Sequence, residues 1–269
     1  MRSRSVGGAP GAAARSGDPA APPGPAPTVT DSTALHLPIE RYLPTADDRA
    51  RISKASGVLL QECMRRHGHS WSPQAAGARS GPVTMTEMRY GVNNPRQAQL
   101  TGYHFGPANP GYHAPSPAPS APPSPEAEPD RGCSDEVRQK LSAGAPFLGA
   151  APLAQRINTD GFAASLRDPS VQAVFRQWAG CMRGQGFRYT TPMDAVNDPS
   201  FTGPSPAAEE TRTATADLRC KERYNVVGTW FAAESGNERS AIRAHASELA
   251  NVQRQMRAQR STADSVVSH

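Results

Sequence analysis

The clearest amphipathic pattern in the first half of the chain lies between Thr45 and Gly68. Apolar residues recur there at the spacing of one helical face, namely at Ile52, Ala55, Leu59 and Cys63. The Thr45 hydroxyl can cap the free amides of a first turn, and Gly68 stands where many helices end in a left-handed residue. The pattern therefore predicts a helix that begins after Thr45 and ends before Gly68.

A second amphipathic helix is predicted between Asp168 and Gly186. Asp168 can cap this helix, and Pro169 suits its first position. Its apolar face comprises Val171, Val174, Phe175, Trp178, Cys181 and Met182. Shorter helices are expected at 95–100 behind Asn94, behind a cap at Ser134, and at 193–196 behind Thr191-Pro192.

The chain from Ser205 to about residue 260 has a strongly helical composition. Ile242, Leu249 and Met256 recur every seven residues, which would suit a short coiled-coil seam and self-association through residues 240–260. His245 and Glu238 occupy the alternate inner positions, which favours a helix that packs on its own domain. Since no segment alternates with the period of a strand, the sequence predicts a mainly α fold.

Two stretches have too little apolar content to fold, which divides the chain into five parts. Residues 1–37 are expected to form a disordered N-terminal tail, and residues 107–129 a disordered linker rich in Pro, Ala and Ser. Residues 38–106 then form a first helical unit, residues 130–260 a second unit with a long C-terminal helix, and residues 261–269 a tail.

A short segment occurs twice, once at the end of each amphipathic helix. CMRRHGHSW at 63–71 aligns with CMRGQGFRY at 181–189. The shared positions are Cys63 and Cys181, Met64 and Met182, Arg65 and Arg183, Gly68 and Gly186, and the aromatic residues Trp71 and Tyr189. We interpret the segment as one structural unit used twice, in which the cysteine faces inward, the glycine turns the chain and the aromatic side chain folds back over the helix end.

One further cysteine follows each copy, Cys133 after the first and Cys220 after the second. Four cysteines allow three pairings, and the duplicated order favours Cys63–Cys133 and Cys181–Cys220. The fold class expected is thus two pseudo-repeated helical units stapled by disulfides. Each bond would contribute about 4 kcal/mol to stability in the chain-entropy model.

Metal binding is the sharpest alternative use of these residues. Cys63, His67 and His69 lie close together in the sequence and would suit a metal-binding or thiol-dependent protein. The second copy has Gln185 and Phe187 at the positions of the histidines, and CxxC pairs are absent. A structural zinc site needs four good ligands, so the disulfide interpretation is favoured and no cofactor is expected. Four buried, unlinked thiols form the third possibility.

The distribution of charge and the absence of known catalytic motifs limit the classes of function that the sequence supports. The formal charge of +5 is scattered along the chain, whereas nucleic-acid binders concentrate theirs. Catalytic and phosphate-binding patterns of the types GxxxxGK(S/T), HExxH, GxSxG and GxGxxG are absent, so nothing indicates an enzyme. No stretch approaches the ~20 apolar residues of a membrane span. Disulfides imply an oxidising, extracytoplasmic location, and since the start of the chain has no apolar signal core, we expect the true start to lie upstream.

The chain resembles a family of uncharacterised actinobacterial secreted proteins and lipoproteins. The resemblance is carried by CMRRHG, CMRGQG and the segment from Ala216 to Lys221, Ala-Asp-Leu-Arg-Cys-Lys. It implies an envelope location, paired cysteines and a mostly helical fold. The expected function is a non-enzymatic interaction or accessory module whose partner is another cell-envelope protein or a transport system.

Overall fold

The structure is a computed structural model that describes residues 26–29, 31–71, 81–113 and 131–268. Within these ranges the chain forms helices joined by turns, without strands, which confirms the mainly α prediction. Most of the predicted tail (1–25) and most of the predicted linker (114–129) lie outside the described residues. The described end of the tail includes a short 3-10 helix, η1 (Ser32–Ala34).

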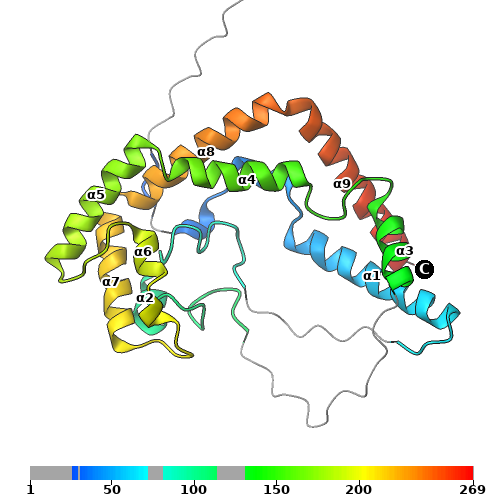
Figure 1. Ribbon diagram of the computed structural model, residues 1–269, viewed down its shortest axis with the longest axis horizontal. Coiled ribbons are helices and arrows are strands. Elements are labelled where there is room, and N and C mark those ends of the chain that lie inside the picture. The colour runs from blue at the N-terminus through cyan, green and yellow to red at the C-terminus, as the bar shows by residue number, and fades with distance from the viewer. Residues whose placement is uncertain (1–25, 30, 72–80, 114–130, 269) are drawn as a thin grey trace, which may run out of the picture.

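The helices form an elongated arch with a lobe at each end (Figure 1). The α1/α3 lobe contains α1 (Ala46–Arg66), α3 (Arg131–Ser142) and the last part of α9 (Ala246–Val267). The α5/α7 lobe contains α2 (Pro95–Leu100), α5 (Pro169–Gly184), α6 (Pro192–Val196), η3 (Pro199–Phe201) and α7 (Ala208–Arg223).

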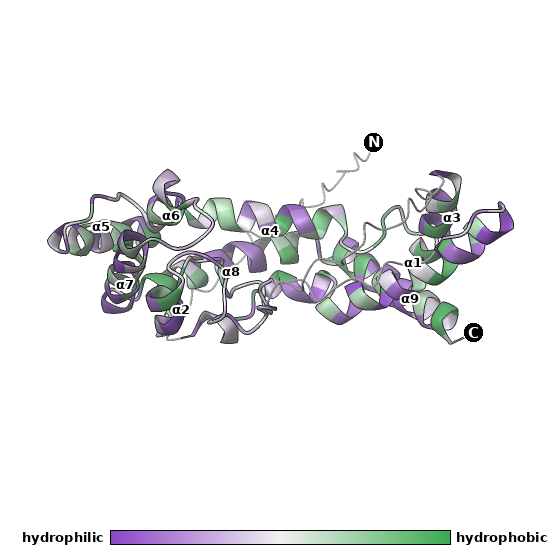
Figure 2. Cartoon of the chain, turned by 90° about the horizontal axis from the view of Figure 1, so that it is seen from below, coloured by the Kyte–Doolittle hydropathy of each residue, from purple (hydrophilic) through white to green (hydrophobic). Residues whose placement is uncertain are grey.

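A bridge of helices joins the two lobes. It consists of α4 (Pro152–Ser165), α8 (Val226–Ala244) and the 3-10 helix η2 (Pro38–Tyr42), together with the start of α9. The second view, turned by 90°, shows the same elongated shape, with apolar and polar stretches alternating along the helices (Figure 2). Such amphipathic helices can bury one face in a thin molecule and leave the other in water.

Each lobe contains helices from both of the units that the sequence predicts. Helix α2, which lies in the segment assigned to the first unit, packs on α7 of the second, and α9 packs on α1 and α3. The tail expected from residue 261 is helical instead, because α9 continues to Val267. Ala263 explains the continuation, since it is buried among α1 and α3 residues and holds the last turns of α9 in place.

The capping residues in the sequence predicted most helix starts correctly. The Thr45 hydroxyl accepts from the Asp48 amide, and the side chains of Asp168 and Asn94 cap α5 and α2 as expected. The predicted Ser134 cap is wrong, because α3 already begins at Arg131 and includes Ser134 in its second turn.

The helical region predicted from Ser205 is also shorter at its start and is broken twice. It begins at Ala208, is interrupted at Asn225, whose φ of 46° is left-handed, and breaks again at His245. Ile242 therefore lies in α8, whereas Leu249 and Met256 lie in α9. All three are buried inside the bridge, in one cluster of the same chain, as expected for a helix that packs on its own domain. Self-association through residues 240–260 stays a prediction.

The largest apolar core belongs to the α5/α7 lobe. The Trp230 ring is fully buried there, and its centroid lies 5.0 Å from that of Phe175, 5.2 Å from that of Tyr90 and 5.5 Å from that of Phe162. The α1/α3 lobe has a smaller core, built on Ala55, Leu59, Val137, Leu141 and Ala263. This core positions the disulfide-bearing helix ends described next.

Candidate functional site

The repeated helix end has the same backbone geometry in both copies. Gly68 and Gly186 have φ angles of 80° and 92°, the left-handed region that glycine enters without strain. In the first copy the His69 amide donates to the Met64 carbonyl at 2.9 Å, and the Gly68 amide to the Arg65 carbonyl at 3.1 Å. The two equivalent bonds of the second copy both measure 3.0 Å. Each copy is therefore a Schellman motif, which satisfies carbonyls at the helix end.

The side chains of the repeat also lie where the pattern places them. Met64 and Met182 are buried, and Trp71 folds back onto the cluster that holds Met64 and the first disulfide. Tyr189 packs in the same way on the core of the α5/α7 lobe, and its hydroxyl donates to Asp198 Oδ2 at 2.6 Å. Burial beside this carboxylate raises the pKa of the Tyr189 hydroxyl. The repeat thus forms a compact helix end of the same kind in each lobe.

The cysteines pair as the duplicated order predicted. Cys63 at the end of α1 is bonded to Cys133 in α3, and Cys181 at the end of α5 is bonded to Cys220 in α7. The Cα atoms lie 5.6 Å and 5.8 Å apart, within the usual range for a disulfide. Each bond fastens one repeated helix end to the helix packed beside it.

The group of potential metal ligands in the structure differs from the group that the sequence suggested. Cys63 and His67 come together with Cys133, and one potential ligand atom from each lies within 4.8 Å of the others. Among the described residues, this group does not include His69. Because both sulfurs belong to one disulfide, neither is a thiolate, the form that binds metals. The set Cys63, His67 and His69 is therefore not what the structure assembles.

The Ala-Asp-x-x-Cys-Lys segment places an ion pair inside the α5/α7 lobe. Lys221 Nζ donates to Asp217 Oδ2 at 2.8 Å, and both side chains are almost completely buried. Trp178 Nε1 donates to Asp217 Oδ1 at 2.9 Å, and the Tyr103 hydroxyl to Oδ2 at 3.3 Å. Burial raises the pKa of the Asp217 carboxyl, and the Lys221 ammonium and the other two donors oppose that shift. The segment therefore fixes α7 against α5 and against the turn after α2 that carries Tyr103.

A second buried network joins α8 to α4 in the bridge. Arg89 pairs with Glu234 and also donates to the Asn158 carbonyl at 3.1 Å, while the Tyr90 hydroxyl donates to Glu234 Oε2 at 2.8 Å. One turn further along α8, Glu238 Oε2 accepts from the Ile39 amide at 3.0 Å. Burial and the nearby Glu234 carboxylate raise the pKa of Glu238 to about 7.

A third polar contact holds the loop before α7. His104 Nδ1 lies 2.8 Å from Glu210 Oε1, and Nε2 lies 2.8 Å from the Gly203 carbonyl. A carbonyl and an ionised carboxylate only accept, so the ring satisfies both when both nitrogens carry protons. These contacts raise the pKa of His104. The His104 ring is thus held between the buried Glu210 carboxyl and the Gly203 carbonyl.

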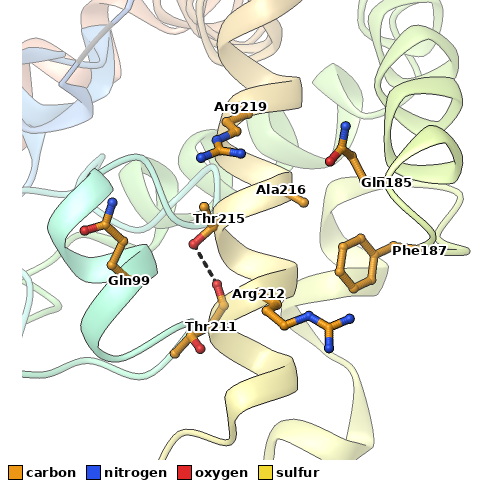
Figure 3. Close-up of a pocket in the computed structure, with 8 residues that line it drawn as sticks. All are labelled: Gln99, Gln185, Phe187, Thr211, Arg212, Thr215, Ala216 and Arg219. Atoms are coloured by element: carbon orange, nitrogen blue, oxygen red, sulfur yellow. Dashed lines mark hydrogen bonds between the residues drawn. The ribbon is translucent and has the colours of Figure 1, made fainter.

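An open groove of about 370 Å³ lies beside the second copy of the repeat. It is lined by Gln99 of α2, by Gln185 and Phe187 of the loop after α5, and by Thr211, Arg212, Thr215, Ala216 and Arg219 of α7. Figure 3 shows Arg212 on the side of Phe187 and Arg219 on the other side of α7 nearer Gln99. A second hollow, of about 470 Å³, opens on the other side of the same loop, lined by Arg183, Gly186, Arg188, Tyr189 and Thr190.

The side chains that line the groove are suited to bind a partner through charge and hydrogen bonds. Arg212 pairs with Glu209 at 3.1 Å, where both side chains are mostly exposed, and such a pair exchanges readily with other anions. In the part of the chain that the structure describes, no carboxylate lies within ion-pair distance of Arg219. Guanidinium groups bind carboxylates and phosphates through paired hydrogen bonds, and Phe187 offers a ring for apolar contact.

Sequence reasoning missed this groove and the buried networks. The groove combines residues of α2, of the loop after α5 and of α7, which lie far apart in the sequence, and Glu210 meets His104 across 106 residues. Only the pair Asp217 and Lys221 left a local signal, the i,i+4 spacing of opposite charges on a helix.

Comparison of the chain with protein-family models, curated protein sequences and solved structures finds no match. Of the helices described, none combines the length and the apolar character needed to cross a membrane.

Proposed function

We propose that the chain is a non-enzymatic extracytoplasmic interaction module of the cell envelope. The observation that carries the proposal is that all four cysteines are consumed in two disulfides, one in each lobe. Disulfides persist in oxidising compartments and are rare where thiol reductants are abundant. The resemblance to actinobacterial secreted proteins and lipoproteins supports the same location.

The placement of the ionisable groups favours binding over proton transfer. The carboxyls with raised pKa values, Asp217 and Glu238, lie inside helix packing, where their bonds hold helices together. The groove beside the second repeat is lined instead by amide, hydroxyl, guanidinium and aromatic groups. These groups recognise a partner through hydrogen bonds, ion pairs and apolar contact.

The interaction surface of this module is the groove with its two arginines. Arg212 and Arg219 favour a partner that presents carboxylates, and Phe187 favours an apolar group beside them. We therefore expect the partner to be an envelope protein, or a component of an envelope transport system, that inserts an acidic segment with an apolar residue.

The location is tested by thiol alkylation of the native protein before and after reduction, followed by mass spectrometry. If the proposal holds, the unreduced protein takes up no alkyl group, and the reduced protein takes up four. Peptide mapping should then recover the linked pairs 63–133 and 181–220. Free thiols in freshly isolated protein would overturn the extracytoplasmic assignment.

The surface is tested by placing a photo-crosslinking phenylalanine analogue at position 187 in cells. The matched control carries the analogue at Lys54, which is exposed on α1 in the other lobe. We expect a discrete adduct from position 187 only, and its loss when R212E and R219E are added. Equal adducts at both positions, or an adduct that survives charge reversal, would contradict this choice of surface.

A further inference from the structure

One corner of the α1/α3 lobe gathers more metal-binding groups than its disulfide requires. His67 follows Cys63 by four residues at the end of α1, and Glu136 follows Cys133 by three residues on α3. The ligand atoms of Cys63, Cys133 and His67 lie within 4.8 Å of one another. Glu136 Oε2 lies 3.5 Å from the Cys63 sulfur. A disulfide sulfur carries no hydrogen to donate, so this approach is a contact rather than a hydrogen bond.

We propose that reduction of Cys63–Cys133 converts this corner into a zinc site, with Cys63, Cys133, His67 and Glu136 as its four ligands. This site goes beyond the proposed function and does not depend on it. Two thiolates, one imidazole and one carboxylate are a donor set that zinc accepts in tetrahedral geometry. The set differs from Cys63, His67 and His69 because α3 supplies two ligands in place of His69.

Cys63, Cys133 and His67 can reach tetrahedral spacing with small movements, and Glu136, which is not one of this compact group, joins them through the oxygen that lies 3.5 Å from the Cys63 sulfur. Zn–S bonds of about 2.3 Å require the two sulfurs to separate to roughly 3.8 Å. Rotation of the two cysteine side chains supplies this change, since breaking the bond frees both torsions. His67 is exposed, and the Glu136 side chain is 31% exposed, so these two ligands leave an open side through which the ion enters.

Neighbouring cations already hold Glu136 in a suitable orientation. Its Oε1 accepts from Arg66 at 2.6 Å and lies 2.8 Å from Lys140 Nζ, which leaves Oε2 directed toward Cys63. Outer groups that orient a metal ligand in this way commonly matter 10-fold or more for affinity. The same two cations offset the negative charge of a site with two thiolates and one carboxylate around Zn²⁺.

A dithiol can supply the electrons and protons that reduction of the Cys63–Cys133 disulfide requires. Thiol–disulfide exchange transfers two electrons and two protons to the protein sulfurs, and the dithiol leaves as its cyclic disulfide. Zn²⁺ then displaces the two thiol protons, so binding releases protons and weakens at acid pH. The oxidised protein has no thiolate at this corner and therefore no zinc affinity of this kind.

The second repeat provides a built-in control. Aligning Cys181 with Cys63 places Gln185 at the position of His67, and aligning Cys220 with Cys133 places Arg223 at the position of Glu136. The second disulfide therefore has the same helix end and the same pairing but lacks both additional ligands. Only the first pair of cysteines should bind zinc after reduction.

The test compares full-length C181A/C220A, which keeps the first pair, with C63A/C133A, which keeps the second. Each variant is reduced with dithiol, freed of reductant without oxygen, and titrated with Zn²⁺ against a chromophoric chelator. We expect one zinc per chain in reduced C181A/C220A, none in its oxidised form and none in reduced C63A/C133A. Substituted Co²⁺ should show sulfur-to-metal charge-transfer absorption in the first variant alone.

Two further substitutions separate zinc binding from a folding defect. H67A and E136Q in the C181A/C220A background should each weaken zinc binding at least 10-fold while the far-ultraviolet circular dichroism of the reduced protein stays the same. Q185H and R223E in the C63A/C133A background should create zinc binding. Equal zinc affinity of the two reduced cysteine variants, or full affinity in H67A, would overturn the proposal. Neither result would affect the location or the groove proposed above.

Discussion

The two ends of the molecule carry the same helix end and the same kind of disulfide on very different cores. In the core of the α5/α7 lobe, Trp178 and Trp230 at the start of α8 are fully buried, and the ion pair of Asp217 and Lys221 is buried beside Trp178. In the α1/α3 lobe, the first disulfide and Met64 form a small cluster beneath Trp71. Two of the pairs that join α1 to α9 and α3, Arg51 with Asp264 and Arg66 with Glu136, lie at the surface. The third, Arg260 with Asp48, is partly exposed on the arginine side only.

This difference shows that one local unit can be supported in two ways. A large apolar core holds α5 against α7 even without help from a covalent bond, because burial of aromatic side chains contributes several kcal/mol each. Surface ion pairs contribute little, so α1 and α3 depend more on their disulfide. Substitutions that remove one support at a time should therefore affect the two lobes differently.

Replacing Asp217 with Ala should damage the α5/α7 lobe most. The substitution leaves the Lys221 ammonium buried without its partner carboxylate, and it removes the acceptor of Trp178 Nε1. Loss of one partner of a buried ion pair costs about 3–5 kcal/mol. Urea-induced unfolding should show this decrease, and hydrogen exchange should show it in α5 and α7 before α1 and α3.

A matched control lies in the other lobe. Asp264→Ala removes the exposed pair with Arg51, which should cost less than about 1 kcal/mol. The double substitution D217L/K221M should recover the part of the loss that comes from the unpaired Lys221 ammonium, because an apolar pair of similar volume often replaces a buried ion pair without penalty. The part that comes from the lost acceptor of Trp178 Nε1 should remain. Equal losses from D217A and D264A would contradict the contrast between the lobes.

Removing each disulfide should change the local stability of its own lobe to a different extent. The closed loops span 70 and 39 residues in sequence, so chain entropy makes their contributions differ by only about 0.5 kcal/mol. Each pair of Cys→Ala substitutions should cost about 2–4 kcal/mol. In C63A/C133A, we expect hydrogen exchange to speed up locally in the end of α1 and in α3.

In C181A/C220A, by contrast, exchange in α5 and α7 should keep its native pattern until the whole molecule unfolds. The reason is that Trp178, Trp230 and Phe175 still pack these helices together. Local opening of α5 and α7 in this variant, with α1 and α3 unchanged in the other, would reverse the comparison.

The features predicted from the sequence are those that depend on neighbouring residues. A cap such as Thr45, a left-handed glycine such as Gly68 and the spacing of apolar residues act within two turns of one helix. The cysteine pairing was also predicted, since each copy of the repeat is followed by one further cysteine along the chain.

The features that escaped prediction depend on chain segments distant in sequence. Nothing near Ser134 indicates that α3 begins three residues earlier, and nothing near Gln99 shows that α2 packs on α7. The groove needs that packing, because its walls come from both helices. The candidate zinc ligand Glu136 likewise lies 73 residues from Cys63, beyond any spacing rule.

Glu238 in the bridge should make stability depend on pH in both lobes together. The folded protein holds this carboxyl at a pKa of about 7, mainly through burial, compared with 4.5 for a free side chain. Between these two values the native state binds more protons than the unfolded chain, so the free energy of unfolding falls as pH rises. The decrease should be about 1–2 kcal/mol, below the limit of about 3 kcal/mol for a fully sequestered group.

Glu238→Gln should remove this slope and make the protein slightly more stable at pH 7. Urea unfolding of both proteins at pH 5 and pH 7 gives the difference, in which all other titrating groups cancel. Because Glu238 accepts from the Ile39 amide between the lobes, probes in α1 and in α7 should shift alike. A slope that persists in E238Q, or a shift confined to one lobe, would contradict this role.

The smallest expected effects test whether the two helix ends are truly equivalent. Gly68→Ala and Gly186→Ala each force an alanine into the left-handed region, and in neither case does the added Cβ meet a neighbouring atom. The cost is then that of the backbone conformation alone, about 1 kcal/mol in both lobes. Gly180→Ala is the control, since it lies inside α5, where the added Cβ meets only the end of the Arg183 side chain at 3.8 Å, and helix propensity favours the alanine by about 0.5–1 kcal/mol. Unfolding midpoints should therefore fall equally for the first two variants and rise for the third. Unequal losses at Gly68 and Gly186 would mean that the surrounding lobe, rather than the repeated unit, sets the stability of each helix end.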